Sequence, residues 1–315
     1  MKQNYDVEAV ITSYNQQSMI YEAVHSLCRQ TVKPKKILIV DDGSTEEQSV
    51  FVLKEIEADS SIPVPLQVIR QANRGVSAAR NTGIRNTKAP LVLVLDGDDR
   101  LEPDFIKEVS RILIEHPAMV AASSWMHTFG VLDAVVRPAG GDVSAFLSRN
   151  CCPATHMFRR EVWEQCGGYD ESMRQGFEDW DFFLNMLEAV ADTFVGIVQK
   201  PLIQYRTAPA SSNVKSMELR LELMRGLIQK HSGIYKEHIA DAVLGVEAVS
   251  MERLFGWENE ITHSIENGQC LSDVSQAFLK NPSYGDGGMA AAVRMESRRM
   301  QSVHHARESA LSDKF

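Results

Sequence analysis

Three carboxylates stand within four positions after a short apolar run, and their types and spacing suit metal chemistry. The run Leu91–Leu95 contains leucine and valine alone, and Asp96, Asp98 and Asp99 follow it. Carboxylates crowded so closely repel one another, and a divalent cation that prefers hard oxygen ligands relieves the repulsion. The pattern therefore predicts a metal-assisted site for a phosphorylated substrate.

Two earlier apolar segments also end in polar residues. Val7–Thr12 runs into a polar turn that contains Tyr14, and Lys36–Val40 runs into Asp41 and Asp42. In an open α/β sheet, ligands bind outside the carboxyl ends of the strands. We therefore expect these polar residues and the three carboxylates to share one edge of a sheet.

A basic residue lies in the connection before the carboxylates. The segment Asn73–Gly83 mixes glycines, small residues and arginines, and Gly75 permits a tight backbone while Ala78 lets a helix pack close to the sheet. Arg80 is expected to project toward the same edge as the acids.

Strand and helix patterns alternate four times from the N-terminus, which predicts a doubly wound α/β sheet. Apolar residues recur at helical spacing after each predicted strand. The pattern changes after Met119, and we interpret the next part as an elaboration of the sheet. It contains expected strands at Val120–Phe129 and Thr155–Phe158 and expected helices at Asp142–Arg149, Arg160–Gly167 and after Glu178. The segment Phe194–Tyr205 is expected as a strand pair or an extended return to the sheet.

Composition narrows the class of protein. The 315 residues are 44% hydrophobic and 24% charged, with a net charge of -9, which argues against nucleic-acid binding. The N-terminus lacks the apolar core of a signal peptide, and the apolar runs fall short of the roughly 20 residues that cross a bilayer. The five cysteines form no C-x-x-C pair, so we expect reduced thiols. These features predict a soluble cytoplasmic protein.

The segment 209–315 is helical in pattern and is expected to form a C-terminal region separate from a domain at 1–208. Gly285–Gly288 is a predicted flexible joint. Beyond it, Arg294, Arg298, Arg299 and Arg307 accompany apolar residues. This last helix either rests on the anionic inner face of a membrane or packs on the protein or on a second subunit.

Taken together, the motifs resemble those of the family-2 glycosyltransferases, inverting enzymes of the GT-A fold that use nucleotide-diphosphate sugars. The resemblance covers about Val7 to Arg206. The motifs that carry it are Thr12–Asn15, Val40–Ser44, Gly75–Gly83, Asp96–Asp99 and Phe158–Asp179. It implies a mainly parallel mixed sheet flanked by helices, with a UDP-sugar favoured as donor.

The resemblance also implies a nucleotide site. Thr12 and Tyr14 would line the base, and Asp42 would accept from the N–H of the base ring. Arg80 would meet the nucleotide, and Asp96 would contact the ribose or orient the metal site. Simpler interpretations stay open, because either acid after the second strand can cap a helix and the arginine can pair with an acid of the sheet edge.

Metal and base positions follow from the same resemblance. Asp98, the second acid of the D-x-D pattern, would bind Mn²⁺ or Mg²⁺, and Asp179 with its neighbour Glu178 would supply the base that takes the acceptor's proton. Alternatively, these last two acids are solvated residues of a first helical turn. Ala208 stands where many members carry a histidine, so the third protein ligand is left open.

Two other functional classes are compatible with parts of the pattern. A sugar-nucleotide-binding scaffold without catalysis would keep the nucleotide site, and Ala208 favours it. A receiver-like regulatory module would explain Asp41 and Asp42 but needs only about a third of the chain. The acceptor, whether glycan, lipid-linked, peptide or small molecule, and any homo-oligomer are not specified by the sequence.

Overall fold

The structure, a computed structural model, describes residues 6–209, 211–267, 269–283 and 286–312, apart from the side chains of residues 212, 213 and 301–312. Gly285 of the predicted joint and the side chain of Arg307 lie outside this part. The chain divides into two compact units, Met1–Ala242 and Val243–Phe315.

Within the described residues of the first unit, nine strands form one sheet. Its order is β3-β2-β1-β4-β8-β6-β9-β5, with β7 paired to β6. Strands β3, β2, β1 and β4 are parallel, whereas β8 runs antiparallel to β4 and β6. The strands are β1 (Val7–Ser13), β2 (Lys36–Asp41), β3 (Leu66–Arg70), β4 (Leu91–Asp96), β5 (Arg100–Leu101), β6 (Met119–Gly130), β7 (Ala134–Val136), β8 (His156–Arg159) and β9 (Phe194–Thr207).

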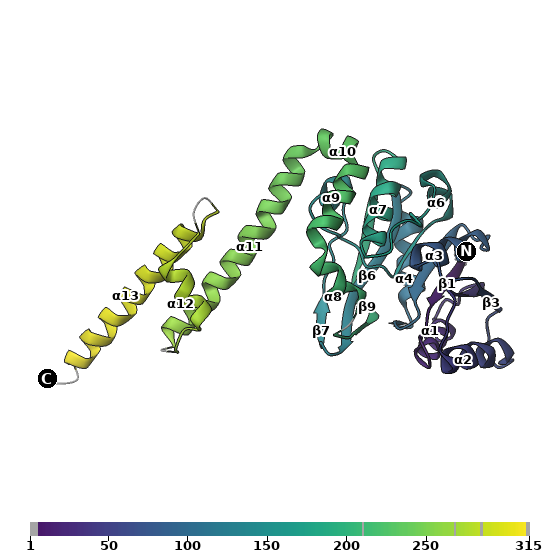
Figure 1. Ribbon diagram of the computed structural model, residues 1–315, viewed down its shortest axis with the longest axis horizontal. Coiled ribbons are helices and arrows are strands. Elements are labelled where there is room, and N and C mark those ends of the chain that lie inside the picture. The colour runs from purple at the N-terminus through teal and green to yellow at the C-terminus, as the bar shows by residue number, and fades with distance from the viewer. Residues whose placement is uncertain (1–5, 210, 268, 284–285, 313–315) are drawn as a thin grey trace. The chain divides into compact units, whose positions relative to one another are not determined.

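Helices cover both faces of this sheet (Figure 1). Those of the first unit are α1 (Met19–Cys28), α2 (Glu47–Ala58), α3 (Val76–Arg85), α4 (Phe105–Glu115), α5 (Val143–Phe146), α6 (Arg160–Cys166), α7 (Glu178–Ala189), α8 (Ser212–Glu218), α9 (Arg220–Lys230) and α10 (Ser232–Glu237), and α11 (Ile239–Glu266) starts in it. The mixed sheet flanked by helices matches the expected GT-A-type fold.

Alternation along β1 explains the two layers. Val7, Ala9 and Ile11 face a core shared with α1, α2 and α4, whereas Val10 faces a second core shared with α3, α6 and α7. Helix α3 lies close to the sheet, because a β-carbon added at Gly83 would collide with Val10. The small residues of the Gly75–Gly83 segment therefore serve close packing, as predicted.

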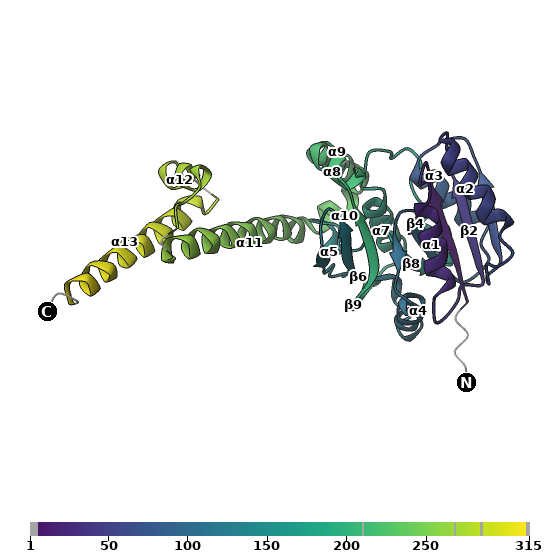
Figure 2. The ribbon, with the colours of Figure 1, turned by 90° about the horizontal axis from the view of Figure 1, so that it is seen from below.

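The second half of the sheet differs in detail from the expectation. The segment expected as a strand pair or an extended return is one strand, β9, which runs beside β6 with register shifts between them (Figure 2). The predicted helix at Asp142–Arg149 is a single turn, α5, capped by the Asp142 side chain. Gly167 ends α6 in a left-handed conformation, as predicted.

Helices α8, α9 and α10 belong to the first unit. Leu227 and Tyr235 are buried in the core that includes α7, and the Tyr235 hydroxyl donates to the carbonyl of Leu147 at 2.9 Å. The compact unit therefore extends past residue 208. The assignment of the segment 209–315 to the acceptor side stays a prediction.

The second unit contains most of α11 together with α12 (Asp273–Lys280) and α13 (Gly288–Ser312). Its core is small, with Ile261, Ala291 and Met295 buried and the rings of Trp257 and Phe278 4.4 Å apart between centroids. No helix in the described part of the chain has the length and apolar character that crossing a membrane requires.

Candidate active site

The carboxyl ends of β1 and β4 place Thr12 beside Asp96 in the sheet register. One oxygen of the Asp96 carboxylate accepts hydrogen bonds from the Arg80 guanidinium at 2.8 Å and from the Thr12 hydroxyl at 3.2 Å. Three residues that the motifs place far apart in the chain therefore meet at one edge. The predicted position of Arg80 at that edge is confirmed.

Arg80 is a buried cation, with 4% of its side chain exposed. Its guanidinium carbon lies 5.3 Å from the centre of the Tyr169 ring. Burial disfavours the charged form, but Asp96, Tyr169 and Asp179 outweigh it and raise the pKa of Arg80 above its ordinary value. The arginine therefore stays charged, and its contact with a nucleotide stays a prediction.

The two acids after β2 hold turns in place. Asp41 accepts from the backbone N–H of Ser44 at 3.0 Å, so it holds the turn before α2 and does not cap that helix, which begins at Glu47. Asp42 accepts from the backbone N–H groups of Arg74 and Gly75 and from the Gln71 amide, at 2.7 to 2.9 Å. About one of its four acceptor positions remains for the predicted contact with a base.

Tyr14 stands at the same edge with an exposed ring. Nearly half of the residue, 47%, is open to solvent, whereas Thr12 is buried. An exposed aromatic ring beside a polar sheet edge offers a face on which a base can stack. Stacking stays a prediction.

The other two acids of the opening pattern have different surroundings. Burial and the neighbouring Asp96 raise the pKa of Asp98 to about 6. Asp99 is buried and accepts from the backbone N–H of Arg206 at 2.8 Å, so it joins the β4–β5 turn to β9. Asp99, which the motif left without a role, has a structural one.

Glu178 and Asp179 form the first turn of α7. Phe177 precedes them with φ 68°, a left-handed conformation that non-glycine residues adopt at a cost. Glu178 accepts from the backbone N–H of Gly176 at 3.0 Å, and Asp179 accepts from the Asn150 amide at 2.9 Å. Burial raises the pKa of Asp179, while Arg80 opposes this rise and Glu178 adds to it. Asp179 is therefore electrostatically coupled to the edge that carries Arg80.

Some polar residues at the site had no sequence signal. His156 on β8 is fully buried, with Nδ1 2.7 Å from the carbonyl oxygen of Ala154 and Nε2 3.3 Å from the Tyr169 hydroxyl. Burial, helped by Arg80, lowers the pKa of His156 to about 3, so the ring is neutral. His156 reaches the site because β8 pairs with β4, where it lies opposite Val94, and the sequence does not specify that pairing.

Asn81 and Arg206 had partial signals, because both lie inside quoted motifs. The Asn81 amide bonds the backbone N–H and carbonyl of Tyr169 and the Trp163 indole, at 2.8 to 3.1 Å. Arg206 donates to the carbonyl of Asp98 at 3.0 Å and to Glu22 at 2.8 Å. Both side chains fix loops that border the site.

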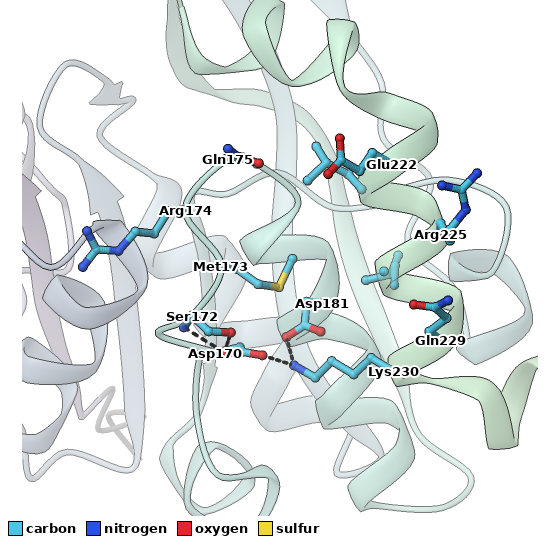
Figure 3. Close-up of a pocket in the computed structure, with 14 residues that line it drawn as sticks. Asp170, Ser172, Met173, Arg174, Gln175, Asp181, Glu222, Arg225, Gln229 and Lys230 are labelled. Atoms are coloured by element: carbon cyan, nitrogen blue, oxygen red, sulfur yellow. Dashed lines mark hydrogen bonds and ion pairs between the residues drawn. The ribbon is translucent and has the colours of Figure 1, made fainter.

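A cavity of about 690 Å³ lies between the loop Asp170–Gly176 and α9. Figure 3 shows Asp170, Asp181 and Lys230 meeting in it, with the lysine nitrogen 2.7 and 2.8 Å from the two carboxylates. It contains none of the predicted site residues. We place the chemistry at the sheet edge, where the charged groups of several motifs meet.

No three His, Cys, Asp or Glu side chains in the described parts of the chain form a group that could hold a metal ion by themselves. Ala208 follows the end of β9 at Thr207 and offers no ligand atom in its side chain.

Comparisons with known proteins give a consistent result. The model of a family described as Glycosyl transferase family 2 matches residues 8–167. YwdF of Bacillus subtilis, an uncharacterized glycosyltransferase, is 26% identical over 71% of this chain and 84% of its own length. GlyA of Streptococcus pneumoniae, a glycosyltransferase, is 30% identical over 119 residues, and the match spans 38% of this chain and 16% of GlyA.

Solved structures of TarS from S. aureus have the same fold. The complex of TarS 1-349 with UDP-GlcNAc has a TM-score of 0.58 at 16% identity, over 98% of this chain and 92% of that one. The complex with UDP has a TM-score of 0.55 over the same shares.

Proposed function

Because this chain belongs to glycosyl transferase family 2, we propose that it is an inverting glycosyltransferase that moves a sugar from a nucleotide-diphosphate donor to an acceptor hydroxyl. One observation carries the proposal: Arg80, Asp96 and Asp179 come from different motifs and interact at one sheet edge. A cation suited to phosphate and a carboxylate suited to proton transfer are both needed for this reaction.

The donor is bound through its nucleotide. Tyr14 stacks on the base, Thr12 lines it, Asp42 uses its remaining acceptor position for a base N–H, and Arg80 with Asp96 holds the rest of the nucleotide. We favour a UDP-sugar, because the TarS structures of the same fold contain UDP-GlcNAc and UDP. The sugar itself is not assigned.

The residues at the edge fit a divalent cation bound together with the donor. The raised pKa of Asp98 shows a carboxylate that its surroundings disfavour as an anion, and a cation would reverse this. Asp98, with Asp96 beside it, would hold Mn²⁺ or Mg²⁺, and diphosphate oxygens and water would supply the other ligands. The ion's chemistry is to neutralise the negative charge of the departing nucleotide.

Asp179 acts as the base. The acceptor hydroxyl loses its proton to this carboxylate while its oxygen bonds the anomeric carbon from the face opposite the diphosphate. The bond from that carbon to the diphosphate oxygen breaks, and its electrons leave with the nucleotide, so the configuration inverts. Glu178 holds the turn through Gly176 and keeps its neighbour in place.

A scaffold that binds the sugar nucleotide without transfer is the second candidate, and Ala208 is the observation that favours it. Family membership leaves the receiver-like module without support. The remaining choice is therefore between an enzyme and a binding protein of the same family.

The test begins with isothermal titration of UDP with and without Mn²⁺, followed by a panel of nucleotide sugars screened for hydrolysis. We expect UDP binding, and turnover of at least one donor that falls by about a hundredfold or more in Asp179→Asn with UDP affinity unchanged. Glu178→Gln is the matched control and should retain more turnover. Retained turnover in Asp179→Asn would require another base, and UDP binding without any turnover would favour the scaffold.

A further inference from the structure

Asn150, on the loop between α5 and β8, contacts the predicted base directly. Its side-chain Nδ2 donates to Oδ2 of Asp179 at 2.9 Å, and its Oδ1 accepts from the backbone N–H of Cys152 at 3.2 Å. A backbone N–H can only donate, so the amide oxygen must face it. The NH₂ group is therefore turned toward the carboxylate by the fold of its own loop.

The last residue of α5, from which this loop starts, is also tied to α7. The indole N–H of Trp180, the residue after the predicted base, donates to the carbonyl of Phe146 at 2.7 Å. Cys151 and Cys152 are both buried, whereas Asn150 is exposed to solvent. The amide is thus a surface group on an anchored loop, and its contact with Asp179 adds little to the core.

We propose that Asn150 is a positioning residue that holds Oδ2 of Asp179 and leaves Oδ1 to take the proton of the acceptor hydroxyl. This inference rests on the proposed role of Asp179 as the base. The reaction stays as written above: the proton moves to Oδ1, the hydroxyl oxygen bonds the anomeric carbon, and the nucleotide leaves with the electrons of the broken bond. Asn150 itself exchanges no proton.

The amide also affects the charge state of the base. Burial and Glu178 favour the neutral form of Asp179, whereas Arg80 and the backbone N–H groups of Asp179 and Trp180 favour the anion. A hydrogen bond donated by Asn150 stabilises the anion further, because the amide nitrogen has no lone pair to accept from a protonated acid. Loss of the amide should therefore lower kcat. It should also shift the acid limb of the profile of kcat against pH to higher pH.

The test compares Asn150→Ala and Asn150→Asp in the full chain with a nucleotide sugar that the wild type hydrolyses, water being the acceptor. For Asn150→Ala we expect about a tenfold lower kcat, a UDP affinity within about twofold of wild type, and an acid limb moved up by roughly half a pH unit. Asn150→Asp puts a second carboxylate against Asp179 and should shift the limb further. Ser148→Ala, on the same loop, is the control and should match wild type.

The outcomes separate this inference from the proposed function. If Asp179→Asn is inactive while Asn150→Ala keeps both the wild-type kcat and the wild-type acid limb, the positioning role is wrong and the base assignment survives. If Asp179→Asn keeps full turnover, the base assignment fails and the positioning role fails with it. A fall in kcat without any movement of the acid limb would indicate a general disturbance of the loop and would also overturn the proposal.

Discussion

Asp96 and Asp98 lie two residues apart but have different surroundings, and the difference suggests different tasks. Asp96 is held by two donors, Arg80 and Thr12. For Asp98, burial and the charge of Asp96 raise the pKa to about 6, and the one hydrogen bond to its carboxylate found in the described residues comes from its own backbone. A carboxylate with few donors is better placed to bind a cation.

We predict that donor turnover depends on Mn²⁺ or Mg²⁺ through Asp98. Asp98→Asn should lower turnover at least about tenfold and abolish the gain in UDP affinity that the metal gives, measured by isothermal titration. The gain should also decline as pH falls through about 6, because the protonated carboxyl binds a cation poorly.

A neighbouring substitution provides the control for this metal prediction. Asp99→Asn should keep the metal response, because an asparagine oxygen can still accept from the Arg206 backbone. Full turnover in excess chelator would show that Asp98 is not a metal ligand in the reaction.

The sequence could predict the site residues that belong to local motifs, and it could not predict those defined by long-range contacts. Asp96 ends β4 and Arg80 follows the Gly75 turn inside α3, so local pattern placed both near the sheet edge, whereas Asp179, in the first turn of α7, was assigned from the family resemblance. Asn150 and His156 lie on a loop and a strand whose relation to α7 depends on the order of strands in the sheet. No local pattern encodes that order.

At the scale of elements, α7 is held on two faces. Trp180 donates to the carbonyl of Phe146, the last residue of α5. On the other side, the fully buried Asp181 accepts from Lys230 at 2.8 Å and lies 3.0 Å from Nε2 of His231, at the junction of α9 and α10. Glu188 meets the other nitrogen of His231 at 2.8 Å. Lys230 and His231 thus hold α7, the helix that carries the predicted base, through Asp181 and Glu188. We call these four residues the α7 clamp.

This clamp predicts a pH-dependent stability. Burial disfavours the charged imidazole, but the hydrogen bonds that its ring donates to the carboxylates of Asp181 and Glu188 outweigh this and raise the pKa of His231 to about 8. A raised pKa stabilises the fold fully below the unfolded value of about 6.5, and the effect is lost as pH rises through about 8. It amounts to about 2 kcal/mol.

Thermal unfolding of the full chain followed by tryptophan fluorescence checks this prediction. His231→Gln should lower the Tm relative to wild type at pH 6 and much less at pH 9.5, where Lys230 still pairs with Asp170 and Asp181. His25→Gln, at an exposed position, is the control and should show no such difference. If the Tm difference between His231→Gln and wild type is the same at both pH values, the charge of the imidazole does not contribute to the stability of the fold.

Strands with long apolar runs could be predicted from the sequence. Elements whose length depends on the segments packed beside them could not. β2 and β4 are buried on both faces, so their central residues form continuous apolar runs. The strand β9 contains Gly196, Lys200 and Pro201 and pairs with β6 through register shifts, so its length depends on its partner. The single turn of α5 likewise depends on the loop that follows it.

At the scale of the whole molecule, the two units differ in how they are stabilised. The first has an extensive core on each face of its sheet, whereas the core of the second contains three buried apolar side chains among those that the structure describes. Its charged contacts include the pair of Arg294 with Glu258, joined by two hydrogen bonds of 2.9 and 2.8 Å. The basic helix α13 is therefore paired with acids of its own unit.

That pairing bears on the two interpretations of α13. Arg299 bonds Glu296 at 2.8 Å, and Arg298 acts on Glu258 together with Arg294. Arginines already paired with carboxylates gain less from an anionic lipid surface, because each contact with the surface competes with an existing one. Packing against protein rather than on a membrane surface stays a prediction, and these pairs are the reason for it.

We therefore predict that α13 does not carry the chain to membranes. Flotation with vesicles of phosphatidylglycerol and phosphatidylcholine should recover the full chain and a version ending at Gly288 in equal, low amounts. Glu258→Gln tests whether the ion pair is the reason. Without the charge of Glu258, Arg294 becomes available to lipid, so this variant should float more than wild type at low salt. The excess over wild type should decrease as added salt screens the attraction. Strong flotation of the unaltered full chain, lost on truncation, would instead support the membrane interpretation.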